Sequence, residues 1–196
     1  MNKIRCPWCP PEDALYIDYH DEEWGIPQRD GRVLFEMLNL EGAQAGLSWR
    51  TVLGKRPTYR EVFDQFDPAR LVLWTEDRIA KALLNPGIIR NRLKVRAVVR
   101  NARALQKEFG GDLDAFARYL WDFSGNVPQQ TEILADYSTR SEAGDCMSSS
   151  LKKLDFTFVG PTICYAFMQA VGMVNDHSTD CFRRQPVRAL AAKWRL

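Results

Sequence analysis

The sequence lacks the features of a membrane-spanning or secreted protein. It has no run of about eighteen apolar residues, the length that a membrane-spanning helix needs, and its opening stretch MNKIRCPW is too short and too polar for a secretory leader. It also lacks an excess of charge of one sign, because 27 Lys and Arg stand against 25 Asp and Glu. We therefore expect a cytoplasmic protein without a membrane partner, and the overall charge does not indicate a nucleic-acid partner.

Disulfides and β-strands are not expected either. The five cysteines are an odd number in a chain without a secretory leader, which argues against a disulfide framework and leaves metal binding or core packing as their roles. No stretch alternates apolar and polar residues with period two. With 196 residues, 45% of them apolar, the chain can bury a core of its own. We predict an all-α protein that forms a single globular domain over residues 1–196, without repeats or low-complexity linkers.

Helical periodicity is what the sequence does contain. Apolar residues recur at helical spacing in five segments, residues 33–38, 57–66, 88–109, 113–120 and 161–171. The second segment is expected to start at Pro57, and the third, which is strongly basic, to end at Gly110. Asp67 and Thr75 are predicted N-caps of two further helices. A surface loop is expected across 125–140.

One carboxylate interrupts the small apolar stretch LEGAQAGLSW at residues 40–49. Continuing the stripe of Leu34, Met37 and Leu38 by one helical step reaches Glu41, so this side chain is expected to face the interior. Negative charge at a helix C-terminus and inside a core is unfavourable without a partner, a ligand or a raised pKa. The alternative is a frayed helix end that points Glu41 to water. The small neighbours and Trp49 favour a cavity for a flat guest with polar edges, such as a nucleobase.

The two histidines stand near opposite ends of the chain. His177 and Cys181 are four residues apart, so on a helical turn both could bind one metal ion. His20 and Cys6 could complete a Cys2His2 set and close a structural zinc site. The alternative is a buried thiol at Cys181 and two surface histidines. Cys9 forms a C-x-x-C with Cys6 and is another candidate ligand, whereas a redox role is disfavoured because no βαβ pattern surrounds it.

A short turn, LNPGI at residues 84–88, joins two predicted helices. Such a hairpin can aim backbone N–H groups at a phosphate. Basic residues then follow without an acidic one as far as Glu108, among them Arg90, Arg92, Lys94, Arg96, Arg100 and Arg103. The alternative is a solvated, charged helix face. Ile89 occupies the place where a second glycine would support the hairpin.

At this point the sequence resembles the DNA-3-methyladenine glycosylase I family, the Tag family of helix-hairpin-helix glycosylases. The resemblance rests on RCPW, LYIDYHDEEWGIP (15–27), LFEMLNLEGAQAGLSW (34–49), FDPARL (66–71), GIIRNRLKV (87–95), LKKLDFTFVGPTICYAFMQAVGMVNDH (151–177) and Cys181. It implies a helix-hairpin-helix glycosylase fold, with one lobe at about 28–125 and a second, zinc-stapled lobe formed by 1–27 and 126–196. It also implies an enzyme that hydrolyses the N-glycosidic bond of 3-methyladenine in alkylated double-stranded DNA, leaving an abasic site and having no lyase activity.

The resemblance also assigns roles to single residues. Glu41 matches the base-recognising carboxylate and is the expected catalytic residue. Tyr19 and Trp49 match aromatic residues of the same pocket, with Tyr16 and Trp24 as further substrate-binding candidates. The matches to the ligands of one structural zinc ion are Cys6, His20, His177 and Cys181. The matches to the DNA-binding residues are Leu47, which would lie against the gap in the DNA, and the hairpin with its following helix, Gly87, Arg90, Arg92 and Lys94.

The expected chemistry needs little acid catalysis, because N3-methyladenine is cationic and leaves as a neutral base. Glu41 would accept hydrogen bonds from the exocyclic amine and favour the cation, and whether it also orients the attacking water stays open. Asp176 is an alternative catalytic carboxylate that could instead orient His177. The alternative function is a non-catalytic, zinc-stapled helical module that binds damaged or bent DNA. A monomer is expected. Cys9 and the tail after Cys181 depart from the family pattern.

Overall fold

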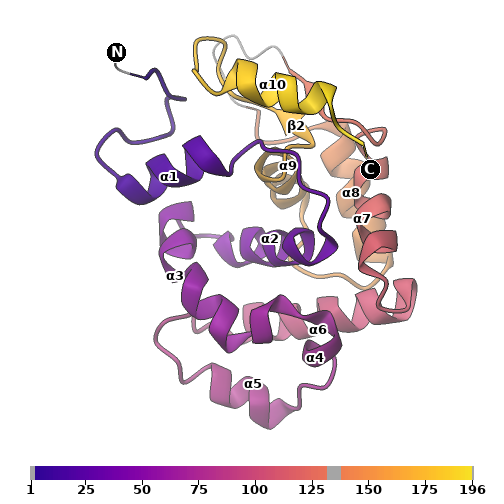
Figure 1. Cartoon of the computed structure of the whole chain (residues 1–196). Coiled ribbons are helices and arrows are strands. Elements are labelled where there is room, and N and C mark those ends of the chain that lie inside the picture. Colours follow the sequence, from indigo (N-terminus) through magenta and orange to yellow (C-terminus); the bar gives the residue numbers. More distant parts are fainter. Residues whose placement is uncertain (1–2, 132–137, 196) are drawn as a thin grey trace.

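The computed structural model describes residues 3–131 and 138–195, and helices dominate that part of the chain (Figure 1). The α-helices are α1 (Ala14–Glu22), α2 (Gly31–Gln44), α3 (Trp49–Val62), α4 (Pro68–Leu71), α5 (Glu76–Ala82), α6 (Arg92–Phe109), α7 (Leu113–Asp122), α8 (Glu142–Lys153), α9 (Pro161–Ala170) and α10 (Arg184–Ala192). A 3-10 turn, η1 (Asp64–Phe66), follows α3. Two strands of two residues, β1 (Gln129–Gln130) and β2 (Val174–Asn175), pair in parallel. The all-α prediction is confirmed.

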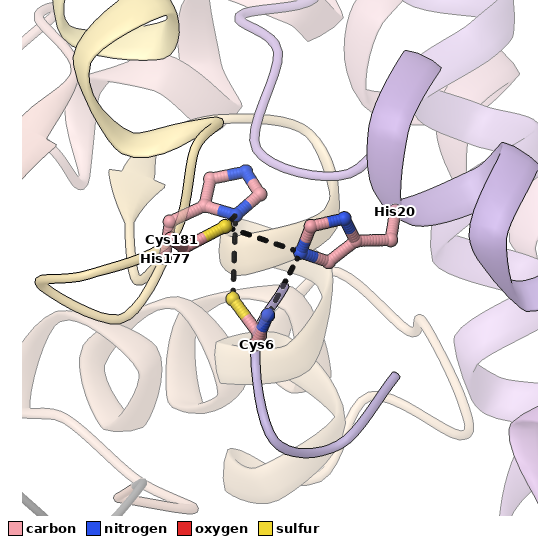
Figure 2. Close-up of side chains that lie close together, drawn as sticks. All are labelled: Cys6, His20, His177 and Cys181. Carbon is pink, nitrogen blue, oxygen red and sulfur yellow. Dashed lines mark hydrogen bonds between the residues drawn. The ribbon is translucent and has the colours of Figure 1, made fainter. Parts of the chain in front are cut away.

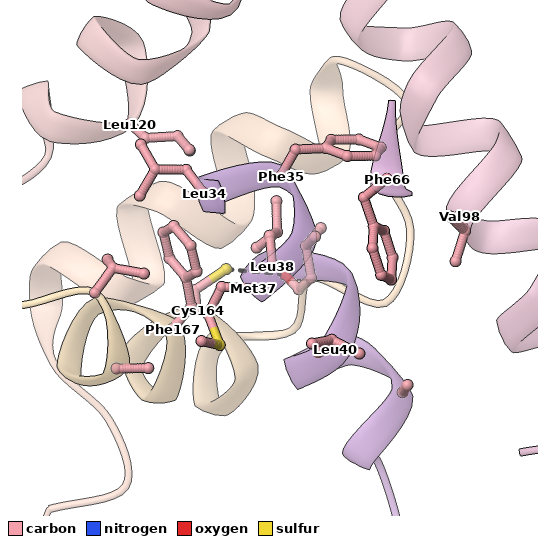
Figure 3. Packing of buried hydrophobic residues seen from close by; sticks show 14 of the residues in the cluster. Leu34, Phe35, Met37, Leu38, Leu40, Phe66, Val98, Leu120, Cys164 and Phe167 are labelled. Atoms are coloured by element: carbon pink, nitrogen blue, oxygen red, sulfur yellow. Dashed lines mark hydrogen bonds between the residues drawn. The ribbon is translucent and has the colours of Figure 1, made fainter. Parts of the chain in front are cut away.

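Helix α2 runs through the middle of the molecule and packs on α3, α6, α7 and α9 (Figure 1). Eleven of its fourteen residues are buried, including Leu34, Phe35 and Leu38. Figure 3 shows Leu34 near Leu120 of α7, and Phe35 near Phe66 of η1. Each fully buried Leu or Phe contributes about 1.5–3 kcal/mol to stability. One cluster of buried apolar side chains extends from Cys6 to Cys181, so both ends of the chain share this core.

Capping residues set the ends of the helices. Asp67 and Thr75 are N-caps of α4 and α5, as predicted, and their side chains accept hydrogen bonds from first-turn N–H groups. Gly110 ends α6 with φ +63°, a conformation that favours glycine. Gly172 follows α9 with φ +72°, and a Cβ at this position would lie 2.4 Å from the nitrogen of Pro27. The chain after α9 therefore packs directly against the segment that leads into α2.

Two predicted helix starts were wrong. The helix expected from Pro57 begins eight residues earlier at Trp49, because Ser48 caps it by accepting from the N–H of Thr51. Pro57 lies inside α3, where its missing N–H removes one backbone hydrogen bond of the helix. The helix ends before the 3-10 turn that contains Phe66. The basic helix expected over 88–109 begins at Arg92, since Asn91 is its N-cap and accepts from two N–H groups.

A buried arginine fixes three helices relative to one another. Arg56 of α3 donates from Nε to Glu36 of α2 at 2.6 Å and from Nη1 to Glu23, the C-cap of α1, at 2.6 Å. Nearby negative charge of Glu23 and Glu36 raises the pKa of Arg56 despite its burial. Breaking a buried pair of this kind costs several kcal/mol, so α1, α2 and α3 are held as one unit.

The N- and C-terminal segments lie on the same side of the molecule (Figure 1). Phe182 donates from its backbone N–H to the carbonyl of Ile4 at 2.9 Å. The loop predicted across 125–140 contains β1, and its residues 132–137 lie outside the described part of the chain. None of the helices in the described ranges has the length and apolar character needed to cross a bilayer.

Candidate functional site

A cavity of about 330 Å³ opens where the C-terminal end of α2 meets α1, α3 and α9. Its lining is rich in aromatic side chains and consists of Trp8, Tyr16, Tyr19, Trp24, Glu41, Gln44, Trp49, Ser138, Thr139, Thr162, Ala166 and Gln169. The five residues predicted to bind substrate are thus brought together around one space. A cavity of this size with flat apolar walls and a few polar groups suits a single planar ring system.

Glu41 is the buried acidic residue of this cavity. It lies in the last turn of α2, is 4% exposed, and burial raises the pKa of its carboxyl to about 8. Within the described residues no donor lies within hydrogen-bond distance of its carboxylate. Burial also raises the pKa of Tyr19 well above its ordinary value, and the charge of Glu41 adds to this effect. The carboxylate is therefore available to a ligand that brings its own donors or positive charge.

Trp49 forms a wall of the cavity and carries a free donor. Its ring centroid lies 5.5 Å from that of Tyr19, and the residue is 8% exposed. Its Nε1 is buried and has no hydrogen-bond partner among the described residues. Buried donors are rarely left unpaired, so this N–H is an exception within the described residues. Ser48, the N-cap of α3, fixes the position of Trp49 at the start of the helix.

Sequence reasoning missed several lining residues, among them Trp8, Gln44, Thr162 and Gln169. Thr162 and Gln169 are seven residues apart on α9, with Ala166 between them, and therefore share one helix face. Two polar residues on one face of the otherwise apolar segment PTICYAFMQAV were the pattern that could have identified them. Asp176, the alternative catalytic carboxylate, is not among the residues that line the cavity.

A cluster of four ligand-type side chains lies beside the cavity. The ligand atoms of Cys6, His20, His177 and Cys181 are all within 4.8 Å of one another and buried. Figure 2 shows Cys6 and His20 approaching from the N-terminal segments and His177 and Cys181 from the C-terminal one. The Sγ atoms of Cys6 and Cys181 lie 3.4 and 3.5 Å from Nδ1 of His177. Two thiols and two imidazoles in this arrangement could hold one metal ion.

Hydrogen bonds around the cluster orient the imidazoles for metal binding. Nδ1 of His20 lies 2.8 Å from Asp21, and Nε2 of His177 lies 3.1 Å from the carbonyl of Trp24. Each ring therefore uses one nitrogen as a donor and directs the other to the centre of the cluster. The carbonyl of Trp24, and not the carboxylate of Asp176, thus contacts the His177 ring, which corrects the orienting role considered for Asp176.

Hydrogen bonds also surround the two sulfur atoms of the cluster. Hydrogen bonds from Cys181, and then from His177 and His20, lower the pKa of the Cys6 thiol. Backbone N–H groups of Ser178 and Arg183 point at the sulfurs of Cys6 and Cys181, each at 3.4 Å. Cys9 is not a member of the four-residue group, and burial raises the pKa of its thiol. Its N–H instead donates to the carbonyl of Cys6 and closes the turn that carries this residue.

The cluster and the cavity share an aromatic wall. The ring of Trp8 lies 5.3 Å from that of His20 and 4.8 Å from that of Trp24, and Trp24 lies 4.6 Å from His177. Trp8 and Trp24 both line the cavity. An ion that fixes the two histidines therefore also fixes one side of the cavity.

The residues predicted to contact DNA fall into two groups. Leu47, 42% exposed, lies between α2 and α3; Arg90, in the turn before α6, and Arg92, its first residue, are both exposed. Lys94 is buried, and its ammonium donates to the carbonyls of Ala43 and Ala45 at 2.8 and 2.6 Å. Lys94 thus holds the segment that leads to Leu47.

The rest of the basic run is largely paired within the protein. Arg96 pairs with Glu76, Arg100 pairs with Asp155 at 3.1 Å, and Arg103 donates to the carbonyl of Trp74. Gly87 lies in the hairpin between α5 and α6, where a Cβ would lie 2.5 Å from the side chain of Thr58. A larger residue would therefore displace this turn from α3.

Comparisons with known proteins agree with this geometry. The family model described as methyladenine glycosylase matches residues 8–184. The chain is 49% identical over 180 residues to the DNA-3-methyladenine glycosylase 1 of Escherichia coli strain K12, covering 90% of this chain and 95% of that protein. A crystal structure of 3-methyladenine DNA glycosylase I superposes with a TM-score of 0.88 at 49% identity, over 91% of this chain and 98% of the other. A structure from Staphylococcus aureus that describes 3-methyladenine recognition superposes with a TM-score of 0.83 at 31% identity, over 88% and 93%. The chain belongs to the methyladenine glycosylase family.

Proposed function

We propose that this enzyme hydrolyses the N-glycosidic bond of 3-methyladenine in alkylated DNA, releases the free base and leaves an abasic site. The observation that carries the proposal is the buried Glu41 carboxylate without a donor of its own, set in an aromatic cavity that has room for one base. Relatives that share about half of their residues with this chain are named for the same activity.

The chemistry follows from the charge of the substrate. N3-methylation makes the base cationic and weakens its bond to the sugar, so the base departs neutral and needs no proton from the protein. The cavity must instead bind an extruded base, which costs a few kcal/mol of unstacking and unpairing. Trp49 and Tyr19 offer ring faces to the cation, and Glu41 accepts from its exocyclic amine. Burial raises the pKa of Glu41 to about 8, and a cation beside the carboxyl would lower this pKa and favour the ionised form.

We further propose that the cluster of Cys6, His20, His177 and Cys181 binds one structural zinc ion. Two thiolates and two imidazoles are a typical tetrahedral set for zinc, and four protein ligands leave no open position for catalysis. The hydrogen bonds at the far nitrogens of both rings support this assignment. In this proposal the ion joins segments 1–27 and 126–196 into a second lobe beside the helical lobe of residues 28–125.

DNA binding is proposed at the face that carries the hairpin and Leu47. The exposed Arg90 and Arg92 would contact phosphates together with the turn at Gly87, as in a helix-hairpin-helix element. Leu47 would fill the gap left by the extruded nucleotide. Lys94 would act here by holding the Leu47 segment through the carbonyls of Ala43 and Ala45. The protein is proposed to act as a monomer on double-stranded DNA.

The first experiment measures bases released from methylated duplex DNA by mass spectrometry, for the wild type and Glu41→Ala, with zinc quantified in both. The proposal expects 3-methyladenine from the wild type, and at least about a tenfold smaller rate from a variant with equal zinc, because hydrogen bonds to a charged group are lost. The alternative is a module that binds damaged DNA without cutting it. Salt-dependent DNA binding without base release by folded, zinc-loaded wild type would favour that alternative.

A further inference from the structure

Asp176 lies behind the cavity and receives three hydrogen bonds. The side chain is 1% exposed. Its Oδ2 accepts from the hydroxyl of Tyr165 at 2.6 Å and from Nε2 of Gln169 at 2.6 Å, and its Oδ1 accepts from the hydroxyl of Thr131. Among these residues Gln169 lines the cavity, whereas Asp176 does not. The aspartate therefore acts on the cavity through the glutamine.

The bond to Asp176 decides which way the Gln169 amide faces. A glutamine side chain ends in one acceptor and one donor group, and the two are interchangeable in shape. A carboxylate accepts only, so the NH2 group of Gln169 must be the part that faces Asp176. The Oε1 atom is then directed away from the aspartate, and the described residues provide no donor for it. Gln169 thus presents the cavity with a hydrogen-bond acceptor of fixed orientation.

An acceptor at this place distinguishes the two purines. Adenine carries an exocyclic amine at C6, which offers two N–H donors, whereas guanine carries an oxygen at C6, which accepts. Glu41 can take one of the two donors, and a second acceptor on the same cavity can take the other. An N3-methylated guanine has the same positive charge. Its O6, however, would face the acceptor oxygens of Glu41 and Gln169, and no hydrogen bond can form between two acceptors. The charge of Glu41 favours both methylated bases, whereas its oxygens accept only from the amine of adenine, and a second acceptor would strengthen this selection.

We propose that Gln169, held in one orientation by Asp176, is a specificity-determining residue that accepts a hydrogen bond from the exocyclic amine of 3-methyladenine and disfavours 3-methylguanine. Asp176 is a positioning residue in this reaction, since it does not touch the base. The inference rests on the proposed function and adds to it the group that selects between methylated purines.

The test compares both bases released from one sample of methylated duplex DNA, as rates for 3-methyladenine and 3-methylguanine. Gln169→Leu is expected to slow 3-methyladenine release about three- to tenfold, the range for one lost neutral hydrogen bond. Release of 3-methylguanine should stay constant or rise, so the ratio of the two rates falls. Asp176→Asn should lower the same ratio, because an asparagine NH2 can donate to Oε1 and let the amide turn. The double variant should have the same ratio as Gln169→Leu alone, since both substitutions remove the same hydrogen bond to the base.

Zinc content and the unfolding temperature of each variant separate selectivity from folding. Gln185→Leu, the same substitution on the exposed side of α10, is the matched control and should keep the wild-type ratio. If Asp176→Asn does not fold, Gln169→Leu decides alone. A ratio within about twofold of wild type in folded, zinc-loaded Gln169→Leu, or equal losses for both bases, overturns the proposal. A wild type that releases neither base contradicts the proposed function itself, which is a different result.

Discussion

Glu41 is kept in the cavity at a cost to stability. Burial raises the pKa of its carboxyl from 4.5 to about 8, so between these values the folded protein holds a proton that the unfolded chain has lost. The folded state binds more protons in this range, and stability therefore falls as the pH rises from about 4.5 to about 8 and is constant above it. A residue that weakens the fold at neutral pH is typical of a binding site that needs a charge.

Glu41→Gln tests this cost directly. The amide has nearly the same shape and no charge, so the variant should be more stable than wild type. The difference should be small at pH 5 and grow to about 4 kcal/mol near pH 8, because one pKa unit corresponds to about 1.4 kcal/mol. Release of 3-methyladenine should fall about ten- to a hundredfold, since a hydrogen bond to a charged group is lost. Thermal unfolding across pH and base release measure the two effects.

The exposed Glu61 of α3 provides the control for this substitution. Glu61→Gln should change neither the pH dependence of unfolding nor base release. A stability difference for Glu41→Gln that does not vary between pH 5 and pH 8 would show that the carboxyl titrates near its ordinary pKa.

At the scale of helices, those boundaries that depend on a conspicuous local signal could be predicted. The stop at Gly110 and the caps at Asp67 and Thr75 depend on neighbours within a few residues, so they could be identified in the sequence. The starts of α3 and α6 were missed, because Ser48 and Asn91 outweigh the more conspicuous Pro57 and the hairpin.

The candidate site divides in a similar way. The inward direction of Glu41 follows from helical spacing, and the cysteine and histidine content of the chain indicated Cys6, His20, His177 and Cys181 as a possible ligand set. His177 and Cys181 meet in a non-helical segment, however, and not on the helical turn that their spacing suggested. The orientation of Gln169 could not be predicted, because it depends on Asp176 and on Thr131, which lies 45 residues away in the chain. The two-residue strands that bring Thr131 to this place are too short to show any alternation.

Helix α10 begins at Arg184, the last residue that the family model matches, and contacts β2. Trp194, just after this helix, stacks on the buried ring of Trp121 at 4.3 Å between centroids. Trp194→Ala should cost about 2 kcal/mol, less than a fully buried tryptophan, and lower the unfolding temperature by about 4–8 °C. Base release below the transition should be unchanged, since Trp194 does not line the cavity.

Arg195→Ala, a change at the exposed neighbour of Trp194, should leave the unfolding temperature at the wild-type value. If Trp194→Ala reduces base release while the protein remains folded, α10 has a part in the reaction that stacking on Trp121 does not explain.

At the scale of the whole molecule, the cluster of Cys6, His20, His177 and Cys181 joins the two ends of the chain and lies beside the cavity. Cys6 and His177, which are 171 positions apart, meet there, and the rings of Trp8 and Trp24 contact the histidines and line the cavity. Cys181→Ser should therefore lose zinc, lower the unfolding temperature by more than about 10 °C and abolish base release, because metal binding contributes to folding and the cavity wall loses its support.

Cys146→Ser is the control that separates the effect of losing the metal ion from the effect of replacing a cysteine by serine. Cys146 is exposed and outside the cluster, so Cys146→Ser should keep zinc, stability and base release at wild-type values. Zinc content by elemental analysis, unfolding temperature and base release on the same preparations decide the matter. A Cys181→Ser protein that has lost its zinc, yet unfolds at the wild-type temperature and excises the base normally, would contradict the coupling between cluster and cavity. Loss of all three properties in Cys181→Ser alone means that the cavity depends on joining both ends of the chain.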